Sequence, residues 1–109
     1  MKNTEIQKFL PLSESTYYIL LSLVESRHGY AIMQHVETIS GGTVTIGPGT
    51  LYGAFNNLEK AGLIRITGEE DRRKYYQLTG MGQQVLAEQI KRLNIMAENG
   101  NKALPYLEK

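Results

Sequence analysis

The chain has 109 residues, of which 41% are apolar and 21% are charged, and its 12 basic and 11 acidic residues leave a formal net charge of +1. This length and composition predict one soluble globular domain with a modest core. There is no cysteine for disulfides or thiolate metal sites, no apolar run near the ~20 residues of a membrane span and no recognisable secretory signal, so we expect a cytoplasmic protein without membrane contact.

The first part of the chain predicts a polar lead-in at residues 1–12 and then a helix. Ser13 suits the N-cap of this helix, because its hydroxyl can accept a hydrogen bond from an otherwise unpaired backbone N–H. The helix is apolar almost all round between Tyr17 and Val24, a pattern that indicates burial on more than one side. We expect a second subunit to cover part of it.

Two further helices follow. Apolar residues recur at helical spacing over 32–39, and the glycine pair at 41–42 is a C-cap signal. Residues 43–47 are predicted to be a turn or a short β-like segment. Pro48 fits the first position of the third helix, because its fixed φ suits a helix and its missing N–H would be unpaired there anyway. This helix is expected to run to about Ala61.

Alternating apolar residues predict two strands at 63–67 and 74–78, with Tyr76 directed into the core. The segment between them, 68–73, is a polar and charged hairpin tip. The predicted order is therefore α-α-α-β-β-α once a last helix is added. This order indicates a mainly α fold with a small β-hairpin wing, a winged helix-turn-helix.

The last helix is predicted to begin after Thr79, a second suitable N-cap, and to extend over about 18 residues. Its apolar side chains recur at steps of three and four residues as far as Ala97. Gly100 and Pro105 are expected to end it. We therefore divide the chain into a winged helix-turn-helix domain, residues 1–78, and a C-terminal helix with its tail, residues 79–109.

The third predicted helix has two different faces. Leu51, Phe55 and Leu58 form an apolar face. Base edges and phosphates require hydrogen-bonding partners and repel carboxylates, so a helix in a DNA groove needs a polar face without acids. The alternative is a plain helical hairpin with a solvated face. The polar side chains are those of Thr50, Tyr52, Asn56, Asn57 and Lys60.

Basic residues in the hairpin form a second candidate for DNA contact. Guanidinium groups can bind phosphate through two hydrogen bonds or enter a narrow minor groove. The alternative is a salt-bridged hairpin, because acidic residues occupy 69–71. The basic set, with a neighbouring tyrosine, consists of Arg72, Arg73, Lys74 and Tyr75.

The last helix has one apolar stripe and no later element in this chain to bury it. It either folds back on its own domain or pairs with a second copy, and the strongly apolar first helix favours the homodimer. Two-fold symmetry also suits palindromic operators. The predicted dimer contacts are Phe9, Leu10, Tyr17, Val85, Ile90, Leu93, Met96 and Ala97.

No combination of residues predicts catalysis. His28 and His35 are not accompanied by an acidic pair at metal-ligand spacing, so both are expected to be surface or helix-capping residues. The glycines form neither a dinucleotide fingerprint nor a phosphate-binding P-loop. We therefore expect no enzyme, no metal and no cofactor.

The chain resembles the short-form PadR-type transcriptional regulators over residues 13–83. This resemblance implies a bacterial winged-helix repressor, held as a homodimer by its C-terminal helix, and family members often respond to small aromatic or drug-like ligands. It also implies that Thr50, Tyr52 and Asn56 face the DNA groove. The matching segments are Tyr17-Tyr18-Ile19-Leu20, His28-Gly29-Tyr30-Ala31-Ile32, Gly47-Pro48-Gly49-Thr50-Leu51-Tyr52, Leu58-Glu59-Lys60-Ala61-Gly62-Leu63-Ile64, Arg72-Arg73-Lys74-Tyr75-Tyr76 and Leu78-Thr79 with Gly82.

Together these observations predict a sequence-specific DNA-binding regulator. It would act as a repressor, bind a palindromic operator in double-stranded DNA as a homodimer, and respond to a small aromatic effector. A protein-interaction module is one alternative, motivated by the near-neutral charge, and a ligand sensor is another. The predicted DNA contacts are Thr45, Gly47, Pro48, Gly49, Thr50, Tyr52, Asn56, Lys60, Arg72, Arg73, Lys74 and Tyr75.

Overall fold

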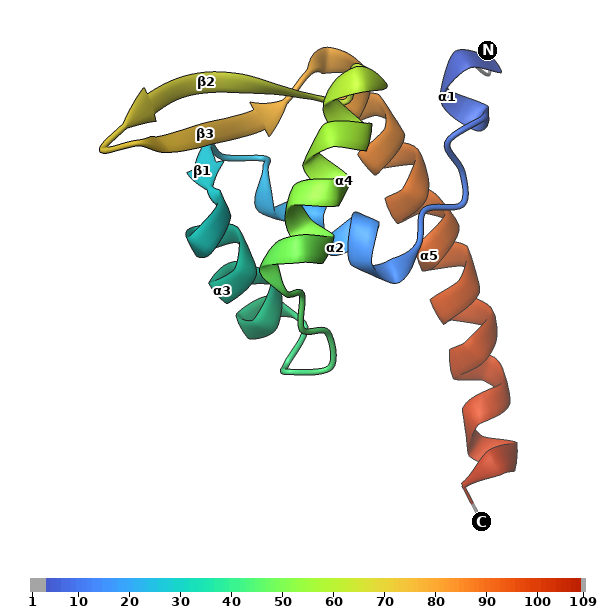
Figure 1. The fold of residues 1–109 in the computed structure, drawn as a ribbon. Helices are drawn as coiled ribbons and strands as arrows, with labels where there is room; N and C mark the ends of the chain where they lie inside the picture. The colour runs from blue at the N-terminus through green and yellow to red at the C-terminus, as the bar shows by residue number, and fades with distance from the viewer. Residues whose placement is uncertain (1–3, 109) are drawn as a thin grey trace.

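The computed structural model describes residues 4–108. Figure 1 shows the helices α2, α3 and α4 packed together beneath a β-hairpin, with α5 running down one side of the domain. This mainly helical arrangement with a small sheet is the predicted winged helix-turn-helix. The elements in chain order are α1 (Thr4–Gln7), α2 (Glu14–Ser22), β1 (Arg27–His28), α3 (Gly29–Ile39), α4 (Pro48–Lys60), β2 (Ile64–Glu70), β3 (Arg73–Leu78) and α5 (Gly80–Leu107).

The starts of the main helices follow from local side chains. Ser13, His28 and Thr79 each accept a hydrogen bond from a backbone N–H in the first turn of α2, α3 and α5, at 3.1, 3.3 and 3.1 Å. Such caps satisfy N–H groups that have no partner within the helix. Pro48 is the first residue of α4. The predicted caps at Ser13 and Thr79 are confirmed, and His28 is a capping residue.

The sheet has three antiparallel strands in the order β1-β3-β2. The short strand β1 was not predicted from the sequence, and it pairs Arg27 with Tyr76 and His28 with Tyr75. It fastens the hairpin to the start of α3. Of the two alternatives predicted for residues 43–47, a turn or a short β-like segment, the structure excludes the second, because this segment is a loop without strand pairing.

The hairpin of β2 and β3, which we call the wing, is longer than the sequence indicated. Its tip consists of Asp71 and Arg72, whose φ angles are 52° and 66°. Positive φ at both central residues matches the right-handed twist of the flanking strands, so pairing continues up to this two-residue turn. The strands therefore include most of the predicted tip.

The hydrophobic core lies between α2, α3, α4, the first turns of α5 and the base of the wing. Phe55 of α4 stacks on Tyr76 of β3, with ring centroids 4.3 Å apart and planes at 28°. Tyr76 and Leu78 are both buried, as predicted. This packing fixes the position of the wing relative to α4.

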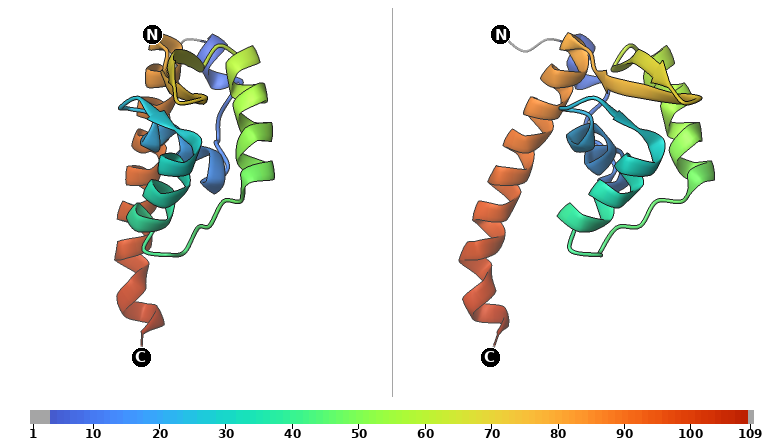
Figure 2. Two further views of the ribbon diagram at one scale, coloured as in Figure 1. Left: turned by 60° about the vertical axis from the view of Figure 1, so that its left-hand side comes forward. Right: turned by 90° about the vertical axis from the view of Figure 1, so that its left-hand side faces the viewer.

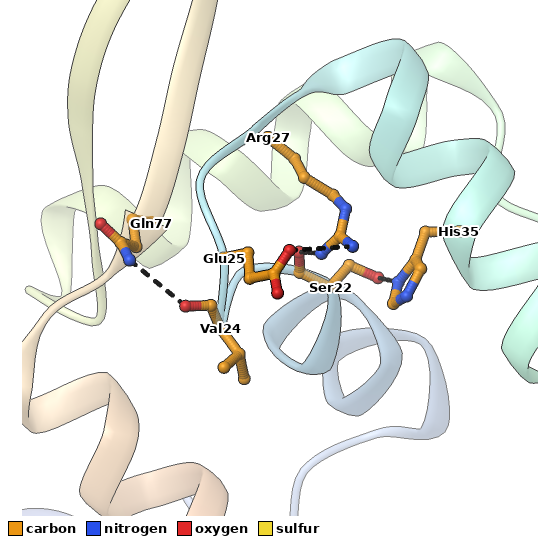
Figure 3. Close-up of polar contacts among 6 residues, drawn as sticks. All are labelled: Ser22, Val24, Glu25, Arg27, His35 and Gln77. Atoms are coloured by element: carbon orange, nitrogen blue, oxygen red, sulfur yellow. Dashed lines mark hydrogen bonds and ion pairs between the residues drawn. The ribbon is translucent and has the colours of Figure 1, made fainter.

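A polar cluster joins the end of α2 to α3 and β1 (Figure 3). The Arg27 guanidinium donates to the backbone carbonyl of Ser22 at 2.6 Å and lies 3.7 Å from the Glu25 carboxylate. The Ser22 hydroxyl donates to the carbonyl of Tyr18 at 2.9 Å, so it accepts from His35 Nδ1, also at 2.9 Å. Burial, and then the Arg27 charge, lowers the pKa of His35, while Glu25 opposes the effect.

Hydrogen bonds also attach β3 of the wing to the loop that follows α2. Figure 3 shows the Gln77 side-chain amide directed at the carbonyl of Val24, at 3.2 Å. The backbone N–H of Leu78 donates to the carbonyl of Leu23 at 3.0 Å. Because residues on β3 and after α2 are linked in this way, the base of the wing is held firmly against the helices.

Helix α5 corrects the prediction for the last helix. It has 28 residues, about 42 Å at 1.5 Å per residue, and continues through Gly100 and Pro105. One internal glycine costs only about 1 kcal/mol, and a proline in the last turn removes one hydrogen bond, so neither stops the helix. Figure 2 shows its second half extending past the rest of the domain. Even so, no helix among residues 4–108 combines the length and apolarity of a bilayer span.

The start of α5 packs directly against backbone. A Cβ added at Gly82 would overlap the carbonyl oxygen of Leu63, and that carbonyl also accepts the N–H of Thr79 at 3.0 Å. Only glycine fits there. The segment that joins α4 to the wing is therefore pressed against the first turn of α5.

Candidate nucleic-acid interface

Helix α4 has the two faces that its sequence predicted. Leu51, Phe55 and Leu58 are buried, whereas Tyr52 is 53% exposed and Asn56 is also exposed. An exposed aromatic side chain between polar neighbours is available for contact with another molecule.

The side chain of Tyr52 is held between α3 and α4. Its ring meets the buried Phe55 ring edge-on, with centroids 5.6 Å apart and planes at 83°. A Cβ added at Gly29 would lie 2.8 Å from the Tyr52 hydroxyl oxygen, which is tighter than a normal contact. The glycine at the start of α3 therefore leaves the space in which the Tyr52 hydroxyl sits.

Tyr52 opens onto a hollow of about 430 Å³ between the start of α3, α4 and the wing, which we call the wing hollow. It brings together two groups of residues that the sequence predicted separately, on α4 and in the wing. No carboxylate is among the residues that line it. These are His28, Gly29, Tyr30, Tyr52, Phe55, Asn56, Arg72, Arg73, Lys74 and Tyr76.

The charge of the wing hollow comes from its cations. Burial raises the pKa of Tyr76, and the nearby Glu59 and Tyr52 raise it further, so the Tyr76 hydroxyl stays neutral at physiological pH. Glu59 is exposed and lies outside the lining of the hollow. Arg72, Arg73 and Lys74 are thus its charged groups.

These cations are not neutralised within the wing. Glu69 lies opposite Lys74 and Glu70 opposite Arg73 in the strand register. Nevertheless, among residues 4–108 no wing cation has a carboxylate oxygen within 4.0 Å. The alternative of a salt-bridged hairpin is not what the structure shows. The basic groups remain exposed and can bind an anion from outside.

The other predicted DNA contacts lie outside the hollow. Tyr75 is partly buried, with its ring edge-on to His28 at 5.3 Å between centroids. The remaining residues are exposed on the loop before α4 or along α4 itself: Thr45, Gly47, Pro48, Gly49, Thr50 and Lys60.

Sequence reasoning missed one exposed residue of the hollow, Tyr30, and its capping neighbour His28. Tyr30 is 59% exposed in the first turn of α3. Its place in the hollow depends on the pairing of β1 with β3, two strands far apart in the sequence. The available local signal was a tyrosine directly after the glycine that begins α3.

The predicted dimer contacts have mixed positions, and one is corrected. Val85 is 0% exposed because it packs inside its own core, so it has no surface to offer a partner. Met96 is 64% exposed, and Ala97 is exposed too. The others are partly buried against their own domain: Phe9, Leu10, Tyr17, Ile90 and Leu93.

A second hollow, of about 510 Å³, lies between α2, α5 and the lead-in. The rings of Tyr17 and Tyr18 meet edge-on at 5.5 Å, and burial together with Tyr18 raises the pKa of Tyr17. The buried side chain of Gln89 accepts the backbone N–H of Leu12 at 2.8 Å and fixes the lead-in to α5. We call this cavity the α2–α5 hollow.

Comparison with known proteins decides the family. The profile described as "Transcriptional regulator PadR-like family" matches residues 18–88. The chain belongs to this family. Within residues 4–108, no group of three metal-ligating side chains comes together. The family itself, the relative YqjI and a PadR-like solved structure are described as transcriptional regulators or transcription factors, a role that is compatible with the candidate nucleic-acid interface described above.

Three relatives illustrate the similarity. The chain is 31% identical over 74 residues to the transcriptional regulator YqjI of Escherichia coli, covering 68% of the chain and 36% of YqjI. It is 42% identical over 59 residues to a 37.1 kDa protein of transposon Tn4556 from Streptomyces fradiae, 54% of the chain and 16% of that protein. A PadR-like transcription factor from Bacteroides fragilis superposes with a TM-score of 0.66 at 28% identity, covering 81% of the chain and 87% of that structure. The chain thus spans only a small part of these two curated relatives.

Proposed function

We propose that this PadR-like regulator is a repressor that binds a palindromic DNA operator as a homodimer. The observation that carries the proposal is the wing hollow, where Tyr52 and Asn56 of α4 meet the cations of the wing on one face. These two segments are the DNA-contacting parts of a winged helix-turn-helix, and here both present donors. Because the wing cations have no internal ion pair within the described chain, DNA phosphates can take that place.

In this proposal α4 lies in the major groove. The Asn56 side-chain amide can pair with an adenine edge through two hydrogen bonds, and Lys60, one turn further along the exposed face, can reach guanine or phosphate. Arg72, Arg73 and Lys74 would bind the neighbouring backbone or minor groove. Residues 1–78 then act as the DNA-binding domain, completed by the core residues of α5.

The homodimer is supported by the exposed half of α5. Apolar or small residues recur there at alternating steps of four and three, the spacing of a helix pair. Small side chains at 97 and 100 would let two helices approach closely. Among the described residues, Leu93 is partly buried against its own domain, whereas the members of the stripe beyond it are exposed. The members of the stripe are Leu93, Ala97, Gly100, Leu104 and Leu107.

An aromatic effector is supported by the α2–α5 hollow. Its volume of about 510 Å³ lies within the ~300–1,000 Å³ range of small-ligand sites, and tyrosine rings form part of its wall. The hollow includes Leu93 of the proposed dimer stripe and the nearby Met96 of the same helix, so a ligand there would contact the helix that is proposed to join the subunits. Thermal-shift screening with planar aromatic compounds tests this part, and a stabilising compound that also releases DNA is the expected result.

A gel-shift titration tests DNA binding. An operator is first selected from a pool of random duplexes with the wild-type protein. Tyr52→Ala should then bind it at least tenfold more weakly, with a far-UV circular dichroism spectrum and melting temperature close to wild type, because Tyr52 is exposed. If wild-type protein does not bind even random duplex at low salt and a protein partner is recovered instead, the protein-interaction alternative replaces this proposal.

Sedimentation equilibrium tests the homodimer. Leu104 is 44% exposed on the stripe, and Leu104→Arg would place a charge between the two helices. We expect the wild type to sediment as a dimer and this variant as a monomer with unchanged helix content. A wild-type monomer at micromolar concentration would rule out the proposed assembly.

A further inference from the structure

We propose that Tyr30 completes a seat for one DNA backbone phosphate inside the wing hollow. This inference rests on the proposed DNA binding and adds a residue that neither the sequence prediction nor the family resemblance assigned to that contact. The seat has three walls. Tyr30 comes from α3, Tyr52 comes from α4, and the cations come from the wing.

The Tyr30 hydroxyl has a proton available for a bound molecule. It is 59% exposed, and its hydroxyl oxygen accepts a hydrogen bond from the Gln34 side-chain amide at 3.3 Å. Gln34 is one helical turn further along α3, so this bond holds the ring in place. Among the described residues nothing accepts the Tyr30 hydroxyl proton, so that proton can be donated to a bound molecule.

The chemistry of the wing hollow matches a phosphodiester better than a base edge. Guanidinium and ammonium groups only donate hydrogen bonds, and the tyrosine hydroxyls can donate as well. Phosphodiester oxygens only accept, whereas each base pair presents acceptors together with donors or a methyl group. The lining contains no carboxylate that would repel the phosphate from within the hollow.

The donors of the seat come from three separate elements whose relative positions are fixed. Because β1 fixes the wing to the start of α3, and Phe55 stacking fixes the wing to α4, the three walls keep their spacing. A phosphate bound in the seat would set how α4 enters the groove without reading any base. Tyr30 is therefore expected to affect affinity for every DNA sequence alike.

The test compares Tyr30→Phe with Tyr106→Phe. Tyr106 is 77% exposed in the last turn of α5, far from the wing, and provides a control for loss of a surface hydroxyl. We expect Tyr30→Phe to weaken binding about three- to tenfold on both the selected operator and a random duplex. The slope of log affinity against log salt should stay unchanged, because no charge is removed. Tyr106→Phe should bind like the wild type.

A second measurement locates the phosphate. Operators are made with a single neutral methylphosphonate at successive backbone positions. At the seated phosphate, neutralisation should weaken the wild type, and Tyr30→Phe should add little further loss; at other contacted phosphates the two effects should add. An additive loss at every position overturns the seat.

The outcomes separate this inference from the proposed function. If Tyr30→Phe binds both duplexes like the wild type while Tyr52→Ala binds weakly, the DNA-binding proposal stands and the seat is wrong. If Tyr30→Phe loses affinity only for the selected operator, Tyr30 reads sequence and the seat is also wrong. If the wild type binds no DNA, both proposals fall together.

Discussion

The hydroxyl end of Tyr52 rests against the backbone of Gly29, where the smallest side chain would come within 2.8 Å of the oxygen. The first residue of α3 thus sets the position of an exposed side chain on α4. Since the hydroxyl is the far end of a half-exposed side chain, a larger residue at 29 would push Tyr52 aside and leave the core intact. This relationship joins the two helices of the helix-turn-helix at the surface that we propose faces DNA.

Gly29→Ala should therefore weaken DNA binding with little effect on folding. We expect about three- to tenfold lower affinity in a gel-shift titration, and a change in unfolding free energy within about 1 kcal/mol. A double-mutant cycle provides the control. In a Tyr52→Ala background, Gly29→Ala should cause no further loss. An equal loss in both backgrounds would show that Gly29 acts independently of Tyr52.

Lys74→Ala tests the wing. Removing one phosphate-binding cation should lower the slope of log affinity against log salt by about 1 and weaken binding to all sequences alike. Lys102→Ala is the matched control, because Lys102 is exposed on the far half of α5 and pairs only loosely with Glu98, at 3.9 Å. A salt slope that stays the same in Lys74→Ala would remove this lysine from the contact surface.

Asp71→Asn tests the tip of the wing. Asp71 has a φ of 52°, a conformation that asparagine adopts readily, so the turn should be kept. The substitution removes a negative charge beside Arg72. We expect DNA binding about two- to fourfold tighter at ~50 mM salt, with the gain fading at high salt because exposed charges are screened. Glu108→Gln, at the opposite end of the molecule, should not reproduce the gain.

Gly82→Ala tests the packing of α5 on the backbone before the wing. Its methyl group would overlap the Leu63 carbonyl oxygen, and backbone cannot move aside as easily as a side chain. We expect a loss of about 2 kcal/mol or more in urea unfolding. Gly80→Ala lies in the same turn with nothing within 4 Å, so it should stay within about 0.5 kcal/mol of the wild type. Equal stability of the two variants would contradict the close contact.

His35→Gln tests the cluster at the end of α2. Burial lowers the pKa of His35 from its ordinary value of 6.5, so below about pH 6.5 the unfolded chain binds a proton that the folded chain does not. The unfolding free energy should therefore fall as the pH drops from about 6.5 towards the lowered pKa. Glutamine can still donate to Ser22 but does not titrate. Melting temperatures between pH 7.5 and 5.5 should decrease less in the variant than in the wild type.

Local sequence signals were sufficient for the four longer helices and the hairpin, because periodicity and caps act over a few residues, whereas the short α1 lies in the segment predicted only as a polar lead-in. Ser13 and Thr79 could be identified as caps on that basis. The strand β1 could not be predicted from local signals, because its two residues form a strand only through pairing with β3, almost fifty positions later. The predicted end of α5 was wrong because Gly100 and Pro105 were taken as stops in a stretch otherwise rich in good helix formers.

The candidate site likewise has residues that local sequence patterns reveal and residues that depend on contacts between distant elements. The polar face of α4 was visible in the sequence, since the spacing of Leu51, Phe55 and Leu58 also fixes which residues face outward. Tyr30 was missed because its neighbours in the wing hollow come from two other elements. Val85 was misassigned because a regular apolar stripe does not reveal where a helix leaves its own core.

The unbroken length of α5 has a mechanical consequence. The same rigid rod anchors the domain through Leu86 and Gln89 and then projects as a free arm of several turns. Because the helix is continuous between these two parts, a small tilt imposed on the arm would also turn the surface that we propose faces DNA. A molecule that binds the arm can thereby change the orientation of α4.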